Sequence, residues 1–215
     1  MEATREAGGR TPRGQGKLLR GRLIDAALAI LDDGHEPSEI SIRGVTRRAG
    51  VSPTAFYLHF EDRNELMRAL VERGFSDFRQ WIQAGAERGA DPQQRLITAA
   101  AAYIAFSREL PERYRLIFSA DLDAEGIVEE PEDMPAVADA AFDDLIYLIT
   151  DYLGLSQPPE NADTLAMGIW SGLHGYATLR HARPNMAVLT DGRALTDEKY
   201  AALLASVWLG APPGQ

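Results

Sequence analysis

Residues 41–60 place the strongest constraint on the fold, because the pattern there predicts two short helices joined by a tight turn. Ser41 is a favoured N-cap residue for a first helix over about 42–49. Gly50 then supplies the left-handed conformation that commonly closes a helix. A second helix follows almost at once, so the two helices must cross at a large angle, as they do in a helix-turn-helix.

The second short helix begins at Ser52, another favoured N-cap residue, with Pro53 at its first position, and is predicted to run to about His59. Its length of about 10 Å, at 1.5 Å per residue, fits a DNA major groove that is about 12 Å wide. Phe56 and Phe60 are four residues apart and can anchor it to neighbouring helices. The two segments therefore predict a DNA-reading motif; the alternative is a helical hairpin that never meets DNA.

Helical periodicity extends through most of the chain. Leu23, Ala27, Ile30 and Leu31 recur at three- and four-residue spacing and form the apolar stripe of a helix that precedes the motif. No segment shows convincing strand-type alternation, so the predicted fold class is all-α, with about nine helices. Beyond the motif the predicted helices cover about 62–87, 91–110, 113–119, 136–153, 161–182 and 196–209.

Charge divides the chain into two parts. The net charge is −10, but residues 1–63 hold ten Lys or Arg against nine Asp or Glu, whereas residues 64–215 hold twelve against 23. An acidic surface repels phosphate, so the first part is the one expected to meet DNA. We therefore expect a disordered basic arm over 1–15, a helix-turn-helix DNA-binding domain over 16–63 and an effector-binding and dimerisation domain over 64–215.

Composition argues against several other classes of protein. The chain has no cysteine, which excludes disulfides and a cysteine nucleophile. No apolar run approaches the roughly 20 residues that span a bilayer, and the N-terminal residues lack the apolar core of a secretory signal, so we expect a cytoplasmic protein away from membranes. His174 and His181 lack a third metal ligand, and Ser171 lacks the glycine of a nucleophile elbow. We expect neither cofactor, metal nor enzymatic activity.

The run AGVSPTAFYLHFEDRNEL, residues 49–66, resembles the signature of the TetR family of transcriptional repressors. The layout agrees along the whole chain, while the motif-level similarity is confined to about residues 20–70. The resemblance implies three N-terminal helices that bind DNA, followed by a helical domain that binds a small ligand and forms a homodimer. Many members have a glycine where this chain has Thr54, so base contacts at that position are expected to differ.

The resemblance also assigns DNA contacts by position. Hydroxyl and aromatic side chains of the second short helix would contact bases or backbone, Pro53 would meet a thymine methyl group, and Arg63 would lie beside a phosphate at a helix N-terminus. For Arg43 the alternative is a solvated surface charge, and for His59 it is a structural role. The predicted DNA-contacting residues are Arg43, Thr46, Arg47, Ser52, Pro53, Thr54, Tyr57, His59 and Arg63.

Aromatic residues concentrate along the predicted helices of the C-terminal part. A helical domain can arrange such side chains around a pocket that also holds a few polar groups, which would suit a small hydrophobic or amphipathic effector. The alternative for each of them is ordinary core packing. The predicted ligand-binding residues are Tyr103, Phe106, Tyr114, Phe118, Phe142, Tyr147, Trp170 and His174.

The segment GIWSGLHGYATLR, residues 168–180, carries three glycines that are costly in a helix interior but permit close helix approach. Its Trp-x-x-x-His-Gly pattern resembles a TetR subfamily named for its Trp, His and Gly. The resemblance implies a two-fold homodimer built from about 161–182 and 196–209. Trp170 and His174 share a helix face, and we expect one of them to face the pocket while the glycines face the partner.

Together these features predict a repressor that binds a palindromic double-stranded DNA operator as a homodimer and is released by a small effector. Arg79 and Trp81, late in the predicted helix over 62–87, lie where a ligand-driven lever would meet the C-terminal domain. Residues 121–135 hold seven acids and two prolines and predict a loop. The alternative is a DNA-binding regulator without a small-molecule effector, controlled by its abundance or by a protein partner.

Overall fold

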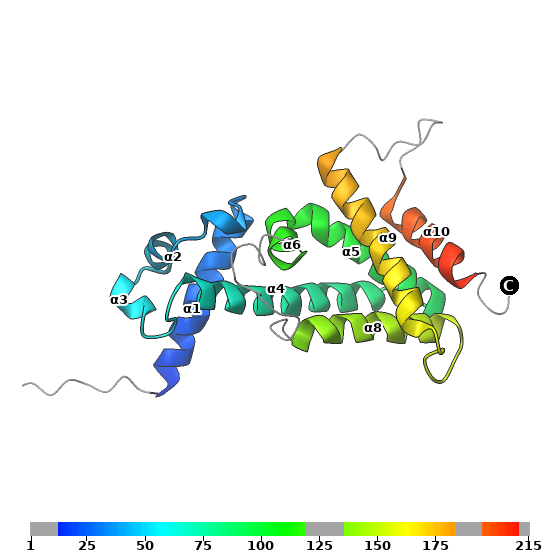
Figure 1. Cartoon of the computed structure of the whole chain (residues 1–215), viewed down its shortest axis with the longest axis horizontal. Helices are drawn as coiled ribbons and strands as arrows, with labels where there is room; N and C mark the ends of the chain where they lie inside the picture. Colours follow the sequence, from blue (N-terminus) through cyan, green and yellow to red (C-terminus); the bar gives the residue numbers. More distant parts are fainter. Residues whose placement is uncertain (1–12, 119–135, 184–194, 211–215) are drawn as a thin grey trace, which may run out of the picture. The chain divides into compact units, whose positions relative to one another are not determined.

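The structure, a computed structural model, describes residues 13–118, 136–183 and 195–210 (Figure 1). Within these residues the chain forms nine α-helices and one 3-10 helix, without a strand, which confirms the predicted all-α class. Two compact units divide it, Met1–Leu70 and Val71–Gln215. None of the described helices is both long and apolar enough to cross a membrane.

Unit 1 holds the two predicted short helices and buries the apolar stripe that precedes them. Leu23 and Ala27 have no exposed surface, and neither does Val45 of the first short helix. Most of the predicted N-terminal arm lies outside the described residues, but its last three residues already belong to the first helix. The elements of unit 1 are α1 Arg13–Asp32, η1 Pro37–Glu39, α2 Ile42–Ala49, α3 Pro53–Phe56 and the beginning of α4 Arg63–Ala86.

Local caps set the boundaries of α2 as predicted. The Ser41 hydroxyl accepts a hydrogen bond from the backbone N–H of Gly44 at 3.2 Å. Gly50 adopts φ 67° and ψ 37°, the left-handed conformation, at the other end. The helix over Ile42–Ala49 is therefore fixed by its own sequence, because both ends carry residues that stop it.

The second short helix is shorter than predicted. It starts as expected, since the Ser52 hydroxyl accepts a hydrogen bond from the backbone N–H of Ala55 at 3.2 Å. It ends at Phe56 instead of His59, and residues 57–59 form a turn. Phe56 and Phe60 are 0% and 1% exposed, so the chain leaves the helical path to bury both rings on the same core.

Unit 2 is organised around α5, whose interior is a run of buried small and aromatic residues. This helix packs against α6, α8, α9 and α10. The small residues permit close approach: a Cβ placed on Gly85 of α4 would lie only 2.5 Å from the Ala102 Cβ. The predicted loop over 121–135 lies outside the described residues. The remaining helices of unit 2 are α5 Pro92–Glu109, α6 Pro111–Phe118, α8 Ala136–Tyr152, α9 Ala162–Ala182 and α10 Asp197–Leu209.

The later part of α4 is tied to its neighbours in unit 2 by specific contacts. The Arg79 guanidinium donates to both carboxylate oxygens of Asp144 on α8, at 2.6 and 3.1 Å. The Trp81 indole N–H donates to the Ala102 carbonyl of α5 at 3.1 Å. A Cβ on Gly74 would lie 2.7 Å from Ile117 of α6. Movement of any of these three helices is therefore coupled to α4.

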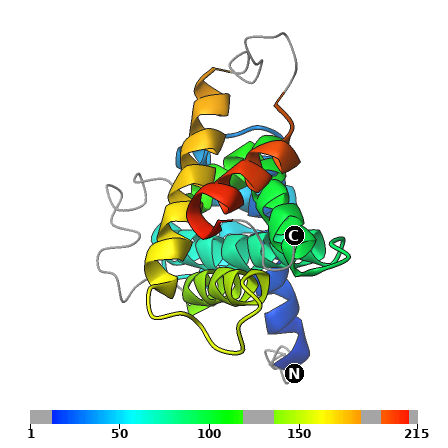
Figure 2. The same ribbon diagram turned by 90° about the vertical axis from the view of Figure 1, so that its right-hand side faces the viewer.

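Helices α9 and α10 lie side by side, as Figure 2 shows. A Cβ on Gly168 would lie 2.6 Å from the Trp208 ring, and one on Gly172 would lie 2.7 Å from Leu204. The expectation that these two glycines face a partner subunit is therefore wrong, because they face α10 of their own chain. A Cβ on Gly175 would meet no atom of the other elements that the structure describes within 4 Å.

Candidate functional site

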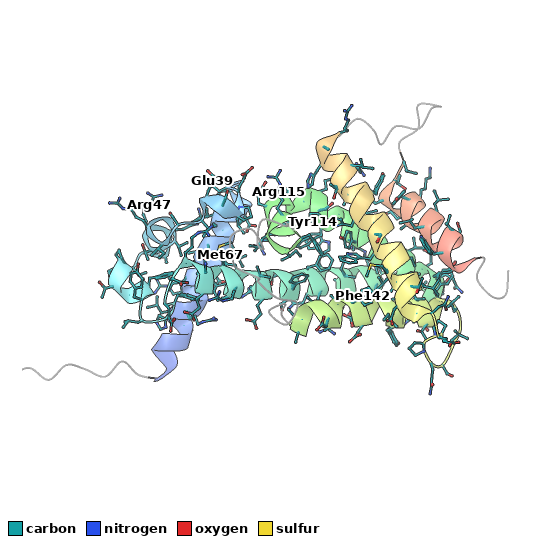
Figure 3. The ribbon with its side chains drawn as sticks, viewed as in Figure 1. Glu39, Arg47, Met67, Tyr114, Arg115 and Phe142 are labelled. Atoms are coloured by element: carbon teal, nitrogen blue, oxygen red, sulfur yellow. The ribbon has the colours of Figure 1, made fainter. Side chains whose placement is uncertain are left out.

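Most of the predicted DNA-contacting side chains lie exposed on α2, on α3 or in the turn that follows. Figure 3 shows Arg47 projecting outward from α2. Tyr57 is 57% exposed, and His59 is only half-buried. An exposed row that combines guanidinium, hydroxyl and phenol groups suits phosphate and base-edge contacts. The exposed members of the predicted set are Arg43, Arg47, Ser52, Pro53, Thr54 and Tyr57.

Thr46 is a correction to the predicted set. Its side chain is 2% exposed, and its hydroxyl donates to the Ile42 carbonyl at 2.9 Å. The helical register turns it into unit 1, whereas the next residue points outward. Thr46 therefore stabilises the packing of α2 and has no free group to offer to DNA.

Arg63 also has a structural role that the sequence did not reveal. Its guanidinium donates to the backbone carbonyl of Ile40 at 2.7 Å and to that of Pro37 at 3.0 Å. These bonds join the first residue of α4 to the segment that leads into α2. The guanidinium thus has an internal role in unit 1, and its contact with a phosphate stays a prediction.

Three further residues of unit 1 lie in or beside the helix-turn-helix, and one of them, Leu58, was missed by the sequence interpretation. Leu58, in the turn after α3, is 74% exposed. The Arg22 guanidinium donates to the carbonyl of Ala49, the last residue of α2, at 2.8 Å, and the Arg20 guanidinium lies 5.0 Å from the centre of the Phe60 ring. The signal that could have identified Leu58 was its position directly after Tyr57.

Unit 2 brings three of the predicted ligand-binding residues into one hydrogen-bonded group, which we call the Tyr–Tyr–His cluster: Tyr103 of α5, Tyr114 of α6 and His174 of α9. The Tyr114 hydroxyl lies 2.7 Å from Nδ1 of His174. The Tyr103 hydroxyl lies 3.2 Å from the same nitrogen and 3.2 Å from the Tyr114 hydroxyl. Both tyrosines are buried, at 5% and 4% exposure.

Burial keeps this cluster uncharged. Desolvation raises the pKa of Tyr103, and the neighbouring Tyr114 raises it further. Desolvation also raises the pKa of Tyr114 and lowers the pKa of His174. All three groups are therefore held in their neutral forms around pH 7, where they act as hydrogen-bonding groups only.

Half-buried aromatic rings surround one side of the cluster. Phe118 of α6 lies 5.6 Å from His174, and Trp170 of α9 lies 6.2 Å from it, as distances between ring centroids. Phe142 of α8, labelled with Tyr114 in Figure 3, lies 6.4 Å from Trp170. Trp170 and His174 thus share a face as predicted, and six of the eight predicted residues gather at one place.

The other two predicted ligand-binding residues lie elsewhere. Phe106 has no exposed surface, and its ring packs on Phe78 and Trp81 at 5.1 and 5.9 Å. Tyr147 is 64% exposed and makes no ring contact with any described residue. The alternative of core packing therefore holds for Phe106, and Tyr147 belongs to the outer surface of α8.

Helices α9 and α10 also expose apolar side chains. These residues lie on the two helices for which a dimer interface was predicted, and each keeps a large exposed fraction within the described residues, although the Trp208 ring also packs against Gly168. Their exposed fractions are 47% for Met167, 50% for Leu179, 54% for Leu203, 69% for Val207 and 42% for Trp208.

Two family models match the chain, one in each unit. The model described as "Bacterial regulatory proteins, tetR family" matches residues 23–70, which contain the helix-turn-helix. The model described as "Tetracyclin repressor-like, C-terminal domain" matches residues 96–203, half of the chain. The chain belongs to the TetR family. This TetR-family transcriptional regulator thus carries the family's DNA-binding motif in unit 1 and its C-terminal domain in unit 2.

Solved structures share the fold of this TetR-family regulator. A protein of unknown function from Rhodococcus sp. RHA1 is 26% identical, with a TM-score of 0.68 over 90% of this chain and 95% of that one. A TetR-family transcriptional regulator from Streptomyces coelicolor is 19% identical, with a TM-score of 0.65 over 89% and 79%. RolR, solved in complex with resorcinol, is 15% identical, with a TM-score of 0.61 over 92% and 91%.

Proposed function

We propose that this regulator is a repressor that binds a palindromic double-stranded DNA operator as a homodimer and is released by a small-molecule effector. The observation that carries the proposal is the exposed row on α2 and α3, within the segment that matches the tetR family model. DNA binding is assigned to unit 1, and effector binding and dimerisation are assigned to unit 2.

The DNA contacts divide by chemistry. Arg43 and Arg47 of α2 neutralise phosphates, while the exposed N-terminal end of α3 presents Thr54 and its neighbours to base edges. Tyr57 donates to a phosphate. Leu58, which is 74% exposed, offers an apolar surface suited to a thymine methyl group.

The exposed apolar residues of α9 and α10 support dimerisation through these helices, and we assign the C-terminal domain to the subfamily named for its Trp, His and Gly. An isologous pair would bury Leu203 and Val207, now 54% and 69% exposed. Two recognition helices could then enter successive major grooves, which lie about 34–36 Å apart.

Effector binding is supported by the aromatic surroundings of the Tyr–Tyr–His cluster and by RolR, a protein of the same fold that was solved with resorcinol. An effector shifts the equilibrium only by its difference in affinity for the two conformations. The contacts of Gly74 and Arg79 couple α4 to α6 and α8, so rearrangement of those helices around a ligand would displace α4.

The DNA-binding part is tested by salt dependence. An operator is first selected from random DNA, and its affinity is measured by fluorescence anisotropy over a salt series. Arg47→Ala is expected to lower the slope of log affinity against log salt by about 0.9, the value for one phosphate contact. The matched control is Arg88→Ala, which removes an exposed arginine from unit 2. An equal salt slope for Arg47→Ala and Arg88→Ala would show that Arg47 does not contact a phosphate.

The dimer is tested by sedimentation of full-length variants. Leu203→Glu is expected to shift the protein toward the monomer, because it places a charge in the proposed interface. Leu155→Glu is the control, since Leu155 is also exposed, at 46%, but lies between α8 and α9. A dimer unaffected by Leu203→Glu, or dissociated equally by both changes, would contradict the assigned interface.

A further inference from the structure

We propose that Arg22 of α1 is a positioning residue for operator recognition, which sets the direction of α3 through the turn of the helix-turn-helix and acts without contacting DNA. The inference rests on the proposed operator binding by unit 1 and adds a residue outside the predicted DNA-contacting set. It starts from the hydrogen bond that the Arg22 guanidinium donates to the Ala49 carbonyl at 2.8 Å.

The first step concerns the C-terminal end of α2. The last turn of a helix leaves backbone carbonyls that the helix itself cannot satisfy. The Thr46 carbonyl accepts a hydrogen bond from the backbone N–H of Val51 at 3.0 Å, whereas the Ala49 carbonyl accepts one from the side chain of Arg22. A positive charge at this end of a helix also interacts favourably with the helix dipole. Arg22 therefore completes the C-terminal cap of α2.

The second step concerns α3, which is too short to hold its own direction. It spans Pro53–Phe56, and a single turn of helix is only marginally stable by itself. Its C-terminal end is anchored by Phe56, which has no exposed surface. Its N-terminal end follows Gly50 and Ser52, which are both exposed, so burial contributes little there. The backbone of the turn therefore determines where the N-terminal end of α3 lies.

The third step concerns α1, which supports this bond from the core of unit 1. Leu23, the residue after Arg22, has no exposed surface and anchors this part of α1. Arg48, in the last turn of α2, forms an ion pair with Asp33, which directly follows α1. The end of α2 is thus fastened to α1 by two polar contacts, so loss of the Arg22 bond leaves α2 in place. Its effect falls on the turn and on the start of α3.

The fourth step concerns the reading of bases. The side chains assigned to base edges belong to Thr54 and its neighbours, which directly follow the turn. Base-edge hydrogen bonds require donor–acceptor distances of about 2.7–3.2 Å, so a small tilt of α3 breaks them. Phosphate contacts from α2 persist, because α2 stays packed on α1. Arg22 therefore contributes to the preference for the operator over unrelated DNA, which base contacts provide and phosphate contacts do not.

The test measures the affinity of full-length variants for the selected operator and for scrambled DNA of the same length. Arg22→Gln is expected to lower the ratio of the two affinities about fivefold, the effect of losing about one hydrogen bond. Arg22→Lys, which keeps a charged donor, should restore part of the ratio. Arg47→Gln is the control, since losing a phosphate contact should weaken both complexes and leave the ratio unchanged. A ratio unchanged by Arg22→Gln would overturn the inference.

A measurement on the wild-type protein makes the inference independent of how the variants fold. Nuclear magnetic resonance detects scalar coupling across hydrogen bonds. A coupling between the Arg22 guanidinium and the Ala49 carbonyl carbon is expected in the free protein and in the operator complex. Its loss in the complex, or a coupling from Arg22 to phosphorus, would refute the positioning role while leaving the proposed function intact. If the wild-type protein selected no operator, the proposed function would fail, and this inference with it.

Discussion

Two alanine substitutions on α9 should have opposite effects on stability, although both replace an interior glycine of one helix. Gly168→Ala places a Cβ 2.6 Å from the Trp208 ring, whereas Gly175→Ala places one with no atom of the other described elements within 4 Å. Both variants gain about 0.8–1 kcal/mol from the higher helix propensity of alanine. This gain is the same in both variants, so the difference between their free energies of unfolding reports packing alone.

The packing penalty follows from the distance. Carbon atoms in contact lie about 3.5–4.0 Å apart, so the Trp208 ring must move by roughly 1 Å, and overpacking of this kind costs about 1–3 kcal/mol. Gly175→Ala should therefore be more stable than Gly168→Ala by about 1–3 kcal/mol. In a domain of this size each 1 kcal/mol shifts Tm by about 2–4 °C, so the melting temperatures should differ by about 2–12 °C.

The assay is thermal unfolding followed by circular dichroism, at one protein concentration, with sedimentation to check that the oligomeric state is unchanged. Tryptophan fluorescence, to which Trp81, Trp170 and Trp208 all contribute, provides a second signal, because only Gly168→Ala should displace the Trp208 ring. Equal melting temperatures, or a higher one for Gly168→Ala, would refute the direct packing of α9 on α10 at this glycine.

Four further outcomes are expected. Thr46→Val should lower the free energy of unfolding by about 0.5–1.5 kcal/mol and leave the salt slope of operator binding unchanged; a reduced slope would restore Thr46 as a DNA contact. Arg63→Met should cost about 1–3 kcal/mol in urea unfolding, because the Ile40 and Pro37 carbonyls lose part-buried bonds from a charged donor, whereas lost affinity at unchanged stability would favour a phosphate contact. Leu58→Asn should change stability by under about 0.5 kcal/mol yet alter base preference in operator selection; an identical selected sequence would contradict the assigned methyl contact. The free energy of unfolding should fall as pH drops below about 6.5, because the lowered pKa of His174 keeps the folded protein from binding a proton that the unfolded chain binds. A His174→Gln variant should show a shallower fall. Parallel pH curves for the two proteins would contradict this role of His174.

The local part of the fold could be predicted because its signals act within a few residues. Ser41, Gly50 and Ser52 each stop or start a helix through the backbone groups beside them, and the structure shows the corresponding caps. The grouping of Trp170 with His174 was predictable for a similar reason, since their spacing places them on one face of a helix.

The remainder depended on tertiary contacts that no local pattern encodes. The absence of a side chain at Gly168 predicted close approach of another helix. It did not indicate whether that helix would be α10 of the same chain or a helix of a partner subunit. Likewise, nothing near Arg63 in the sequence indicates that its carbonyl partners lie more than twenty residues earlier, at Pro37 and Ile40. The early end of α3 follows from burial of Phe60, which competes with the helical path.

The hydrogen bonds of Arg63 also determine which parts of unit 1 can move independently of one another. They fasten the first residue of α4 to the backbone just before α2, so α4 is joined to unit 1 by these bonds as well as by residues 60–62, which link it to the turn after α3. If the first turn of α4 moved, these bonds would move α2 with it. Residues 60–62 alone would allow α4 to move while α2 stayed in place. In the proposed effector response, the helix-turn-helix and the first turn of α4 would therefore move together as one rigid group.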